Sequence, residues 1–264
     1  TDEQYRNRGL VRALFEMLHA RSDAEGHLAQ AITGIPYFYR QFGYEYTLDL
    51  GGYRATRVAA IPQRQGDDPE PYSLRPAAYA DIPLLSTLYD QRLNTSLLWH
   101  EAPETLWRYY IACWDDPAVQ DRDQREVGLF ARQYIIDDAA GHAAGFVWTG
   151  AKRQGGDLAV SALEFLPHVN WPTAMPALLR ALAEIARSLP CMGPTDEPFV
   201  AIRFRLGRTH PAYAALGEPL APPGEHVRRD RQQLQRHEDA DEIARRCHDR
   251  HAQDGAHHEG VVLR

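Results

Sequence analysis

The 264-residue sequence has the composition of a globular protein, with 44% hydrophobic and 25% charged residues, enough for one or two domains. Its net charge of -7 argues against general nucleic-acid binding, because no excess positive charge is available to displace counterions. No apolar run approaches the roughly 20 residues that a membrane-spanning helix needs. The three scattered cysteines are typical of a reduced, cytoplasmic protein.

The first feature along the chain is a basic turn at residues 6–12 that runs into an amphipathic helix. Arg6, Arg8 and Arg12 surround a single glycine, Gly9. A glycine turn at a helix N-terminus presents backbone N–H groups and the positive dipole end to an anion. The residues alone leave two interpretations open, a solvated helix cap or a pyrophosphate site. The apolar face of the predicted helix comprises Val11, Leu14, Phe15 and Leu18.

A strand and a short helix are predicted to follow. The apolar run at 28–33 indicates a buried strand. Pro36 suits the first turn of a helix and Gly43 suits its exit, so residues 36–43 are predicted to form one turn or two before another strand. Tyr39 lies among aromatic neighbours, and the residues alone favour a core-filling role for its ring.

Two motifs in this region resemble those of the GNAT superfamily of acyl-CoA-dependent N-acetyltransferases, and together they cover about residues 4–50. The family's phosphate motif, Arg/Gln-x-x-Gly-x-Gly/Ala, is matched at Arg6 and Gly9. It departs at Val11, where the family has a small residue. The later motif, an aromatic-Tyr pair followed by Gly-aromatic, is matched by Phe38-Tyr39 and Gly43-Tyr44.

The resemblance implies acetyl-CoA as co-substrate and no metal. Tyr39 would protonate the departing CoA thiolate after an amine attacks the thioester, which a phenol can do because it is protonated at neutral pH. The expected acceptor is a small-molecule amine or a protein amine, neither nucleic acid nor membrane is an expected partner, and a homo-oligomer is an open alternative. The expected cofactor-binding residues are Arg6, Arg8, Gly9, Leu10, Val11 and Arg12, and the expected catalytic residue is Tyr39.

In the family, strands and helices ahead of the phosphate turn supply much of the acceptor pocket. Because this sequence begins at Thr1, just before the turn, we expect residues 1–60 to form the C-terminal half of an acetyl-CoA-binding domain. Residues 61–71 combine proline, glycine and charge without apolar periodicity, which predicts a linker.

Residues 72–224 resemble a second, nearly whole GNAT domain. The resemblance and the pattern together predict a mixed α/β fold, with a mostly antiparallel sheet flanked by helices. A helix capped by Asp81 should contain Ile82 to Tyr89. The further expected elements are a strand at 72–74, a helix at 106–114, strands at 127–137, 143–149 and 158–166, a helix at 174–189, a strand at 199–206 and a helix at 211–216.

The two copies can be aligned as an internal repeat, similar to the enhanced-intracellular-survival group of acetyltransferases. That alignment places Ala174, Pro176 and Ala177 where the first copy has its basic turn. Pro176 lacks an N–H group and the glycine is absent, so we expect that the second copy does not bind CoA in the usual way. Tyr213, which aligns with Tyr39, is expected to be structural.

Residues 225–264 contain no Phe, Trp or Tyr, and this composition predicts a disordered tail. His248, His251, His257 and His258 suggest a metal site as an alternative, although no cysteine pair lies at ligand spacing. For the whole chain two functions remain open: an N-acetyltransferase, or a catalytically silent GNAT remnant with a structural, oligomerisation or regulatory role.

Overall fold

The chain forms two compact units. The first contains residues 1–52 and 227–264, and the second contains residues 53–226. None of the helices in the described ranges combines the length and apolar character that crossing a bilayer requires. The computed structural model describes residues 2–33, 38–49, 53–64, 66–92, 96, 99–116, 131–192, 197–207, 209–217 and 260–263.

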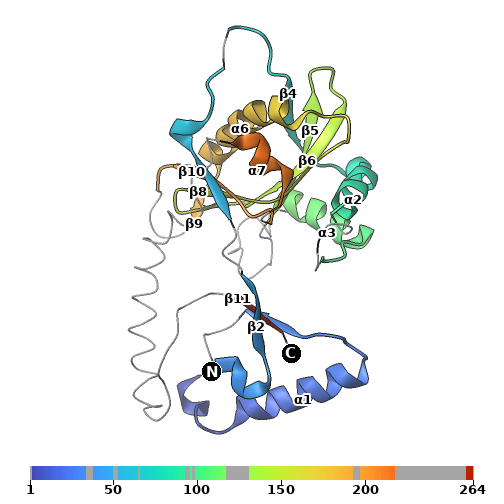
Figure 1. Cartoon of the computed structure of the whole chain (residues 1–264), viewed down its shortest axis with the longest axis vertical. Coiled ribbons are helices and arrows are strands. Elements are labelled where there is room, and N and C mark those ends of the chain that lie inside the picture. The colour runs from blue at the N-terminus through green and yellow to red at the C-terminus, as the bar shows by residue number, and fades with distance from the viewer. Residues whose placement is uncertain are drawn as a thin grey trace. The chain divides into compact units, whose positions relative to one another are not determined.

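The first unit has a long helix and a three-stranded antiparallel sheet in the order β1-β11-β2 (Figure 1). Its small core is aromatic: Phe15 and Tyr44 are buried, and Val11, Tyr39 and Phe42 pack against them. The helix is held to the strands by Val11 and Phe15, whereas Leu14 and Leu18 of the predicted apolar face are exposed. The elements are the 3₁₀ turn η1 (Glu3–Tyr5), α1 (Leu10–Ala24), β1 (Ala31–Thr33), the 3₁₀ turn η2 (Phe38–Phe42), β2 (Glu45–Asp49) and β11 (Gly260–Leu263).

The middle strand of this small sheet comes from the C-terminal end of the chain. Thr33 of β1 pairs with Val261 of β11, and Val261 also pairs with Leu48 of β2. The sequence predicted a disordered tail over 225–264, whereas the structure describes a strand in its last residues. The other tail residues, including the four histidines of the metal alternative, lie outside the described part of the chain.

The second unit is built on a larger sheet in which the strands lie in the order β3-β10-β8-β6-β5-β4. Every neighbouring pair along this order is antiparallel except β10 with β8, which is parallel. The predicted mixed α/β fold with a mostly antiparallel sheet is confirmed. The strands are β3 (Arg54–Arg57), β4 (Tyr72–Pro76), β5 (Arg132–Asp138), β6 (Ala143–Thr149), β7 (Arg153–Gln154), β8 (Asp157–Phe165), β9 (Cys191–Met192) and β10 (Ala201–Phe204).

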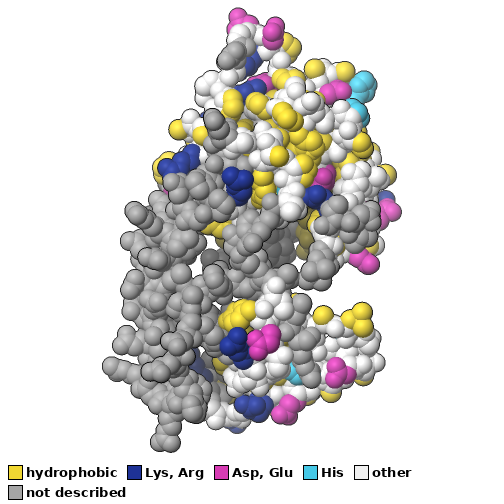
Figure 2. Space-filling model, viewed as in Figure 1, with side chains coloured by type: hydrophobic (Ala, Val, Ile, Leu, Met, Phe, Trp, Pro, Cys, Tyr) yellow, Lys and Arg dark blue, Asp and Glu magenta, His cyan; other side chains and the backbone are white. Residues whose placement is uncertain are grey.

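Helices cover both faces of this sheet, and each face has its own core. Successive side chains of a strand point to opposite faces, so Ile136 of β5 joins one apolar cluster while Ile135 joins the other. The first cluster includes buried residues of α6 and α7, and the second includes those of α2 and α3. Hydrophobic side chains also reach the visible surface around α6 and α7 (Figure 2). The helices are α2 (Ile82–Asp90), α3 (Glu104–Asp115), α6 (Trp171–Ser188) and α7 (Pro211–Leu216), with 3₁₀ turns η3 (Val58–Ala60) and η4 (Tyr79–Asp81).

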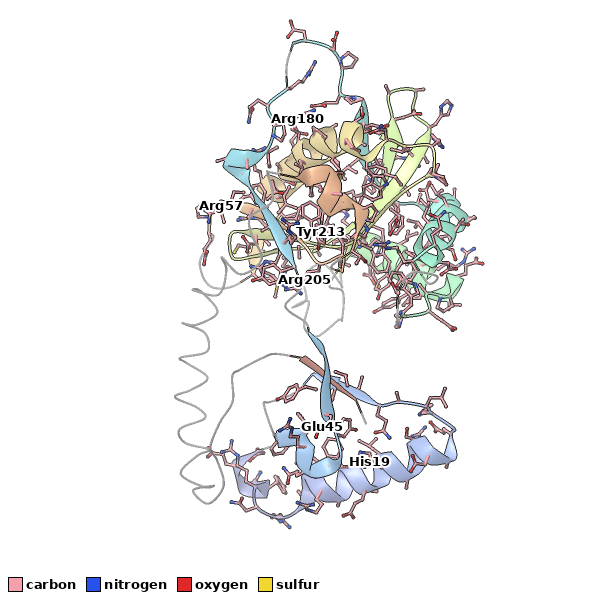
Figure 3. All side chains as sticks on the ribbon, viewed as in Figure 1. His19, Glu45, Arg57, Arg180, Arg205 and Tyr213 are labelled. Carbon is pink, nitrogen blue, oxygen red and sulfur yellow. The ribbon has the colours of Figure 1, made fainter. Side chains whose placement is uncertain are left out.

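The segment predicted as the domain boundary and linker is tied to the second unit. Strand β3 pairs with β10, and Ile61 lies in the core at 6% exposure. Arg180 on α6 donates to both carboxylate oxygens of Glu70, at 2.6 and 2.7 Å, and to the carbonyl of Pro62 at 2.9 Å (Figure 3). The division between the units therefore falls at Gly52, ahead of the predicted boundary at residue 60.

Asp81 was expected to cap α2 but holds the turn before it instead. Its carboxylate accepts a hydrogen bond from the Ala78 backbone N–H at 2.8 Å. It also accepts two from the Arg75 guanidinium, at 2.7 and 2.8 Å, in a bidentate pair. These bonds to Arg75 hold the pKa of Asp81 below its usual range.

We expect Asp81→Asn to destabilise the second unit at neutral pH by about 1 kcal/mol, a modest figure because Arg75 is partly exposed. A carboxyl group with a lowered folded-state pKa stabilises the protein above its unfolded pKa, and this contribution disappears as pH falls through the folded value. The difference in urea-unfolding free energy between wild type and Asp81→Asn should therefore shrink on acidification below about pH 4. Asp67→Asn, at an exposed carboxylate, is the matched control; a pH-independent difference for Asp81→Asn would contradict the expectation.

Candidate functional site

The basic turn of the first unit contains two residues in the left-handed region of backbone conformation. Gly9 is the N-cap residue of α1 and has a φ of 72°, in the left-handed region. Asn7, two residues earlier, also has a positive φ, of 59°. A Cβ atom on Gly9 would meet nothing within 4 Å, so glycine serves the conformation here and not a close approach within the chain.

The first turn of α1 directs unsatisfied donors outward. The first intrahelical bond runs from the Ala13 N–H to the Gly9 carbonyl at 3.1 Å. The N–H groups of Leu10, Val11 and Arg12 have no intrahelical acceptor by helix geometry. Gly9 has no side chain to cap them, and the first turn has no acidic residue. An anion at this end would be favoured by the donors and by the helix dipole.

The three arginines around the turn are exposed and make contacts of different kinds. Arg6 pairs with Glu3 at 3.3 Å, a surface ion pair worth about 0–1 kcal/mol that a phosphate could readily replace. The Arg8 guanidinium lies 5.5 Å from the centroid of the Tyr5 ring. Arg12 donates to the Gln41 side-chain oxygen at 3.1 Å, which links the turn to η2.

Tyr39 lies on η2, close to the first turn of α1. Its ring is half-buried, with its centroid 5.8 Å from that of Phe15 and 6.2 Å from that of Tyr44. Among the described residues its hydroxyl has no hydrogen-bond partner. Val11 packs against the same aromatic cluster, so the structure brings the basic turn and Tyr39 together. Pro36, the predicted start of this short helix, lies outside the described residues; the turn ends before Gly43, which has a φ of 86°.

The second unit has no counterpart of the basic turn at the aligned residues. Ala174, Pro176 and Ala177 all lie inside α6, and both alanines are buried. The helix begins earlier, at Trp171, where the Asn170 side chain accepts from the Thr173 N–H at 3.2 Å. The loop between β8 and α6, residues 166–170, contains neither glycine nor arginine. The aligned residues are therefore helix interior, and the loop ahead of α6 lacks the glycine and arginines of the basic turn.

Tyr213 makes contacts that fit the structural role expected for it. Its hydroxyl donates to the Phe204 carbonyl at 2.9 Å and accepts from the Leu206 N–H at 3.3 Å. Burial raises the pKa of Tyr213. The ring is 6% exposed, and the hydroxyl ties the end of β10 to α7.

A cavity in the second unit was not predicted from the sequence. Strands β8 and β10 pair only from Asp157 to Val160, opposite Ala201 to Phe204. Beyond Val160, β8 continues to Phe165 without β10 beside it. A cavity of about 260 Å³ lies where these strands separate, lined from β8 by residues 161–164 and after β10 by residues 205–207.

One wall of this cavity carries a buried polar network. Glu164 pairs with Arg92 at 2.7 Å. The His210 Nδ1 accepts from the Ala212 N–H at 3.1 Å, so the proton of a neutral ring lies on Nε2. That Nε2 is 3.0 Å from the Leu163 carbonyl and 3.4 Å from the Glu164 carboxylate. Arg92 follows α2, Glu164 lies on β8 and His210 precedes α7, so the fold brings together residues that are far apart in the sequence. Within the described ranges, no group of three or more His, Cys, Asp or Glu side chains could hold a metal ion.

Comparisons with known proteins give similar solved structures but no matching sequence. No known family pattern and no curated protein sequence matches it. Solved structures with a similar arrangement of elements include N-acetyltransferases, and one of them is a tandem GNAT protein.

Three solved structures illustrate the likeness. A GCN5-related N-acetyltransferase from Kribbella flavida is 18% identical, with a TM-score of 0.48, over 99% of this chain and 50% of that one. A tandem GNAT protein from the clavulanic acid biosynthesis pathway is 18% identical, with a TM-score of 0.45, over 83% of this chain and 69% of that one. Eis1 from Mycobacterium abscessus is 15% identical, with a TM-score of 0.43, over 83% of this chain and 50% of that one. The chain thus spans about half the length of the first of these structures.

Proposed function

We propose that the chain belongs to an acyl-CoA-dependent N-acetyltransferase and that its first unit binds acetyl-CoA. The observation that carries this proposal is the left-handed Gly9 at the start of α1, with Arg6, Arg8 and Arg12 around it. The pyrophosphate of acetyl-CoA would accept hydrogen bonds from the backbone N–H groups of residues 8–12. The arginines would supply the positive charge.

Tyr39 is the proposed general acid. The acceptor amine attacks the thioester carbonyl carbon, a C–N bond forms, and the C–S bond then breaks. The Tyr39 hydroxyl gives its proton to the departing sulfur, and the proton lost by the amine nitrogen restores the phenol through solvent or a base. The products are an N-acetyl amine and CoA thiol. The half-buried ring keeps Tyr39 near the turn, and its hydroxyl has no competing partner among the described residues.

The test of this function is release of CoA thiol from acetyl-CoA by the full chain, with spermidine and a single-lysine peptide as acceptor probes. Tyr39→Phe should lower the rate of thiol release by about 100-fold or more, the usual contribution of a general acid. Its affinity for acetyl-CoA should stay close to that of wild type, because the proposed pyrophosphate contacts come from the turn.

Tyr79→Phe, which removes an exposed phenol of the second unit, is the control and should leave the rate unchanged. Equal rates for wild type and Tyr39→Phe would remove Tyr39 from the mechanism. No thiol release and no acetyl-CoA binding by the wild-type chain would instead favour the catalytically silent remnant.

A further inference from the structure

We propose that strand β11 is a positioning element for Tyr39, the general acid proposed above. β11, Gly260–Leu263, lies between β1 and β2 in the sheet of the first unit (Figure 1). Tyr39 lies on η2, in the stretch of chain that joins β1 to β2. The inference rests on the function proposed for the first unit, and it gives a segment at the other end of the sequence a part in that function.

Strand β11 joins the two ends of this stretch through its backbone. Ile32 of β1 pairs with Val262 of β11, and Val262 also pairs with Tyr46 of β2. Neighbouring strands of a sheet lie about 4.8 Å apart, so β1 and β2 are about 10 Å apart and too distant to bond to each other. Among the described residues, β11 is therefore the strand that keeps β1 and β2 in one sheet.

The residues that Val262 joins also pack against the aromatic cluster that contains Tyr39. Phe15 and Tyr44 are the buried centre of this cluster. Ile32, Tyr39 and Tyr46 pack against that centre as partly buried side chains. The Tyr44 N–H also donates to the Tyr39 carbonyl at 3.3 Å. Because β11 fixes Ile32 and Tyr46 relative to each other, it restricts where the Tyr39 ring can lie against α1.

The basic turn is held by contacts that do not include β11. Its backbone bonds are local, from the Tyr5 N–H to the Asp2 carbonyl at 3.0 Å and from the Ala13 N–H to the Gly9 carbonyl at 3.1 Å. Loss of β11 should therefore displace Tyr39 more than it disturbs the proposed acetyl-CoA contacts. A displacement of about 1 Å at a catalytic group can cost about 100-fold in rate.

The experiment compares the full chain with a chain that ends at residue 255 and so lacks β11. Thiol release from acetyl-CoA with spermidine as acceptor should fall by about 100-fold in the shortened chain. Its affinity for acetyl-CoA, measured by calorimetry, should stay within about threefold of that of the full chain. Equal rates of thiol release for the two chains would overturn the proposal.

A peptide of residues 256–264, added at about 1 mM, should restore the rate of the shortened chain, because a flexible link supplies a strand at about that effective concentration. The same peptide with an N-methyl group at Val262 is the matched control. It keeps every side chain and charge but lacks one ladder donor, so it should restore far less. Equal restoration by the two peptides would contradict pairing between β1 and β2.

A double-mutant cycle tests whether β11 acts through Tyr39. In the Tyr39→Phe background, removal of residues 256–264 should lower the rate by no more than about twofold, because the group that β11 positions is already absent. A loss as large as in the wild-type background would overturn the proposal. In the uncut chain, Val262→Pro should also lower the rate, by about tenfold or more, whereas Val262→Ile keeps the N–H and should lose far less.

A readout without catalysis separates this inference from the proposed function. In the chain labelled with 3-fluorotyrosine, the ¹⁹F resonance of Tyr39 is assigned by its loss in Tyr39→Phe. We expect it to shift on removal of residues 256–264 and to return with the unmodified peptide. The five tryptophans, between residues 99 and 171, all lie in the second unit, so unchanged tryptophan emission would show that this unit is intact. An unshifted Tyr39 resonance overturns the positioning role, whereas a shifted resonance in a chain that releases no thiol supports it and refutes only the proposed function.

Discussion

Gly9→Asp should abolish acetyl-CoA binding by the full chain without unfolding it. The new carboxylate would face the pyrophosphate at the start of α1, where like charges a few ångströms apart repel by several kcal/mol near a protein surface. We expect an affinity loss of at least about 100-fold, measured by calorimetry. A Cβ at this residue would meet no neighbouring atom within 4 Å, so the only structural cost is that of a left-handed L-residue, about 1–2 kcal/mol.

Gly9→Asn is the matched control for this prediction. It has nearly the same size, bears the same cost of about 1–2 kcal/mol for a left-handed L-residue, and lacks the charge. Its affinity should therefore lie much closer to wild type. The gap between the two variants should narrow as salt is added, because screening weakens the repulsion. Equal affinity of Gly9→Asp and wild type would place the pyrophosphate elsewhere.

Trp107→Ala should cost the second unit about 3–5 kcal/mol of unfolding free energy, the largest stability effect we expect from one substitution. Trp107 is fully buried between α3 and the sheet. Its ring centroid lies 5.5 Å from that of Tyr89 and 5.1 Å from that of Trp148, both in edge-to-face geometry. Removing the ring therefore leaves a cavity and deletes two aromatic contacts. Urea unfolding monitored by circular dichroism measures the loss.

Trp107→Phe separates the ring contacts from the indole N–H. The N–H is buried and without a partner among the described residues, so its removal carries no hydrogen-bond cost. Phenylalanine keeps an aromatic ring in place, and the expected loss is below about 1.5 kcal/mol. Equal unfolding free energies for Trp107→Ala and Trp107→Phe would contradict the prediction, because they would show that the aromatic contacts with Tyr89 and Trp148 do not stabilise the unit.

Helices and most strands of the second unit could be predicted because their signals are local. The apolar spacing of Ile82 to Tyr89 and the segment at 211–216 correspond to α2 and α7. Strand β3, Arg54–Arg57, has no local apolar pattern that would predict it. These four residues form a strand by pairing with the edge of the sheet at β10. Asp81 does lie directly before α2, as expected, but its carboxylate binds Arg75 of β4 and does not cap the helix. The sequence pattern could not predict this partner because it lies on another element.

The candidate sites divide in the same way. The basic turn combines glycine, arginines and a helix start within seven residues, so it can be recognised without a fold. The cavity depends on the separation of β8 from β10, and its polar wall depends on Arg92 and His210 both contacting Glu164. No sequence spacing encodes that meeting. The internal alignment placed the second copy's turn at residues 174–177, which lie inside α6. It did so because the apolar spacing used for the alignment is the same at the start of a helix and in its interior.

The edge strand β3 has a mechanical consequence. It begins at Arg54, two residues after the division between the units at Gly52. Tension applied to the chain at Gly52 would therefore act first on the β3–β10 hydrogen bonds, where Arg54 pairs with Phe204. Detaching β3 would expose the backbone of β10, the strand that borders the cavity. Force at this end of the unit would thus reach the strand beside the cavity before the rest of the sheet unfolds.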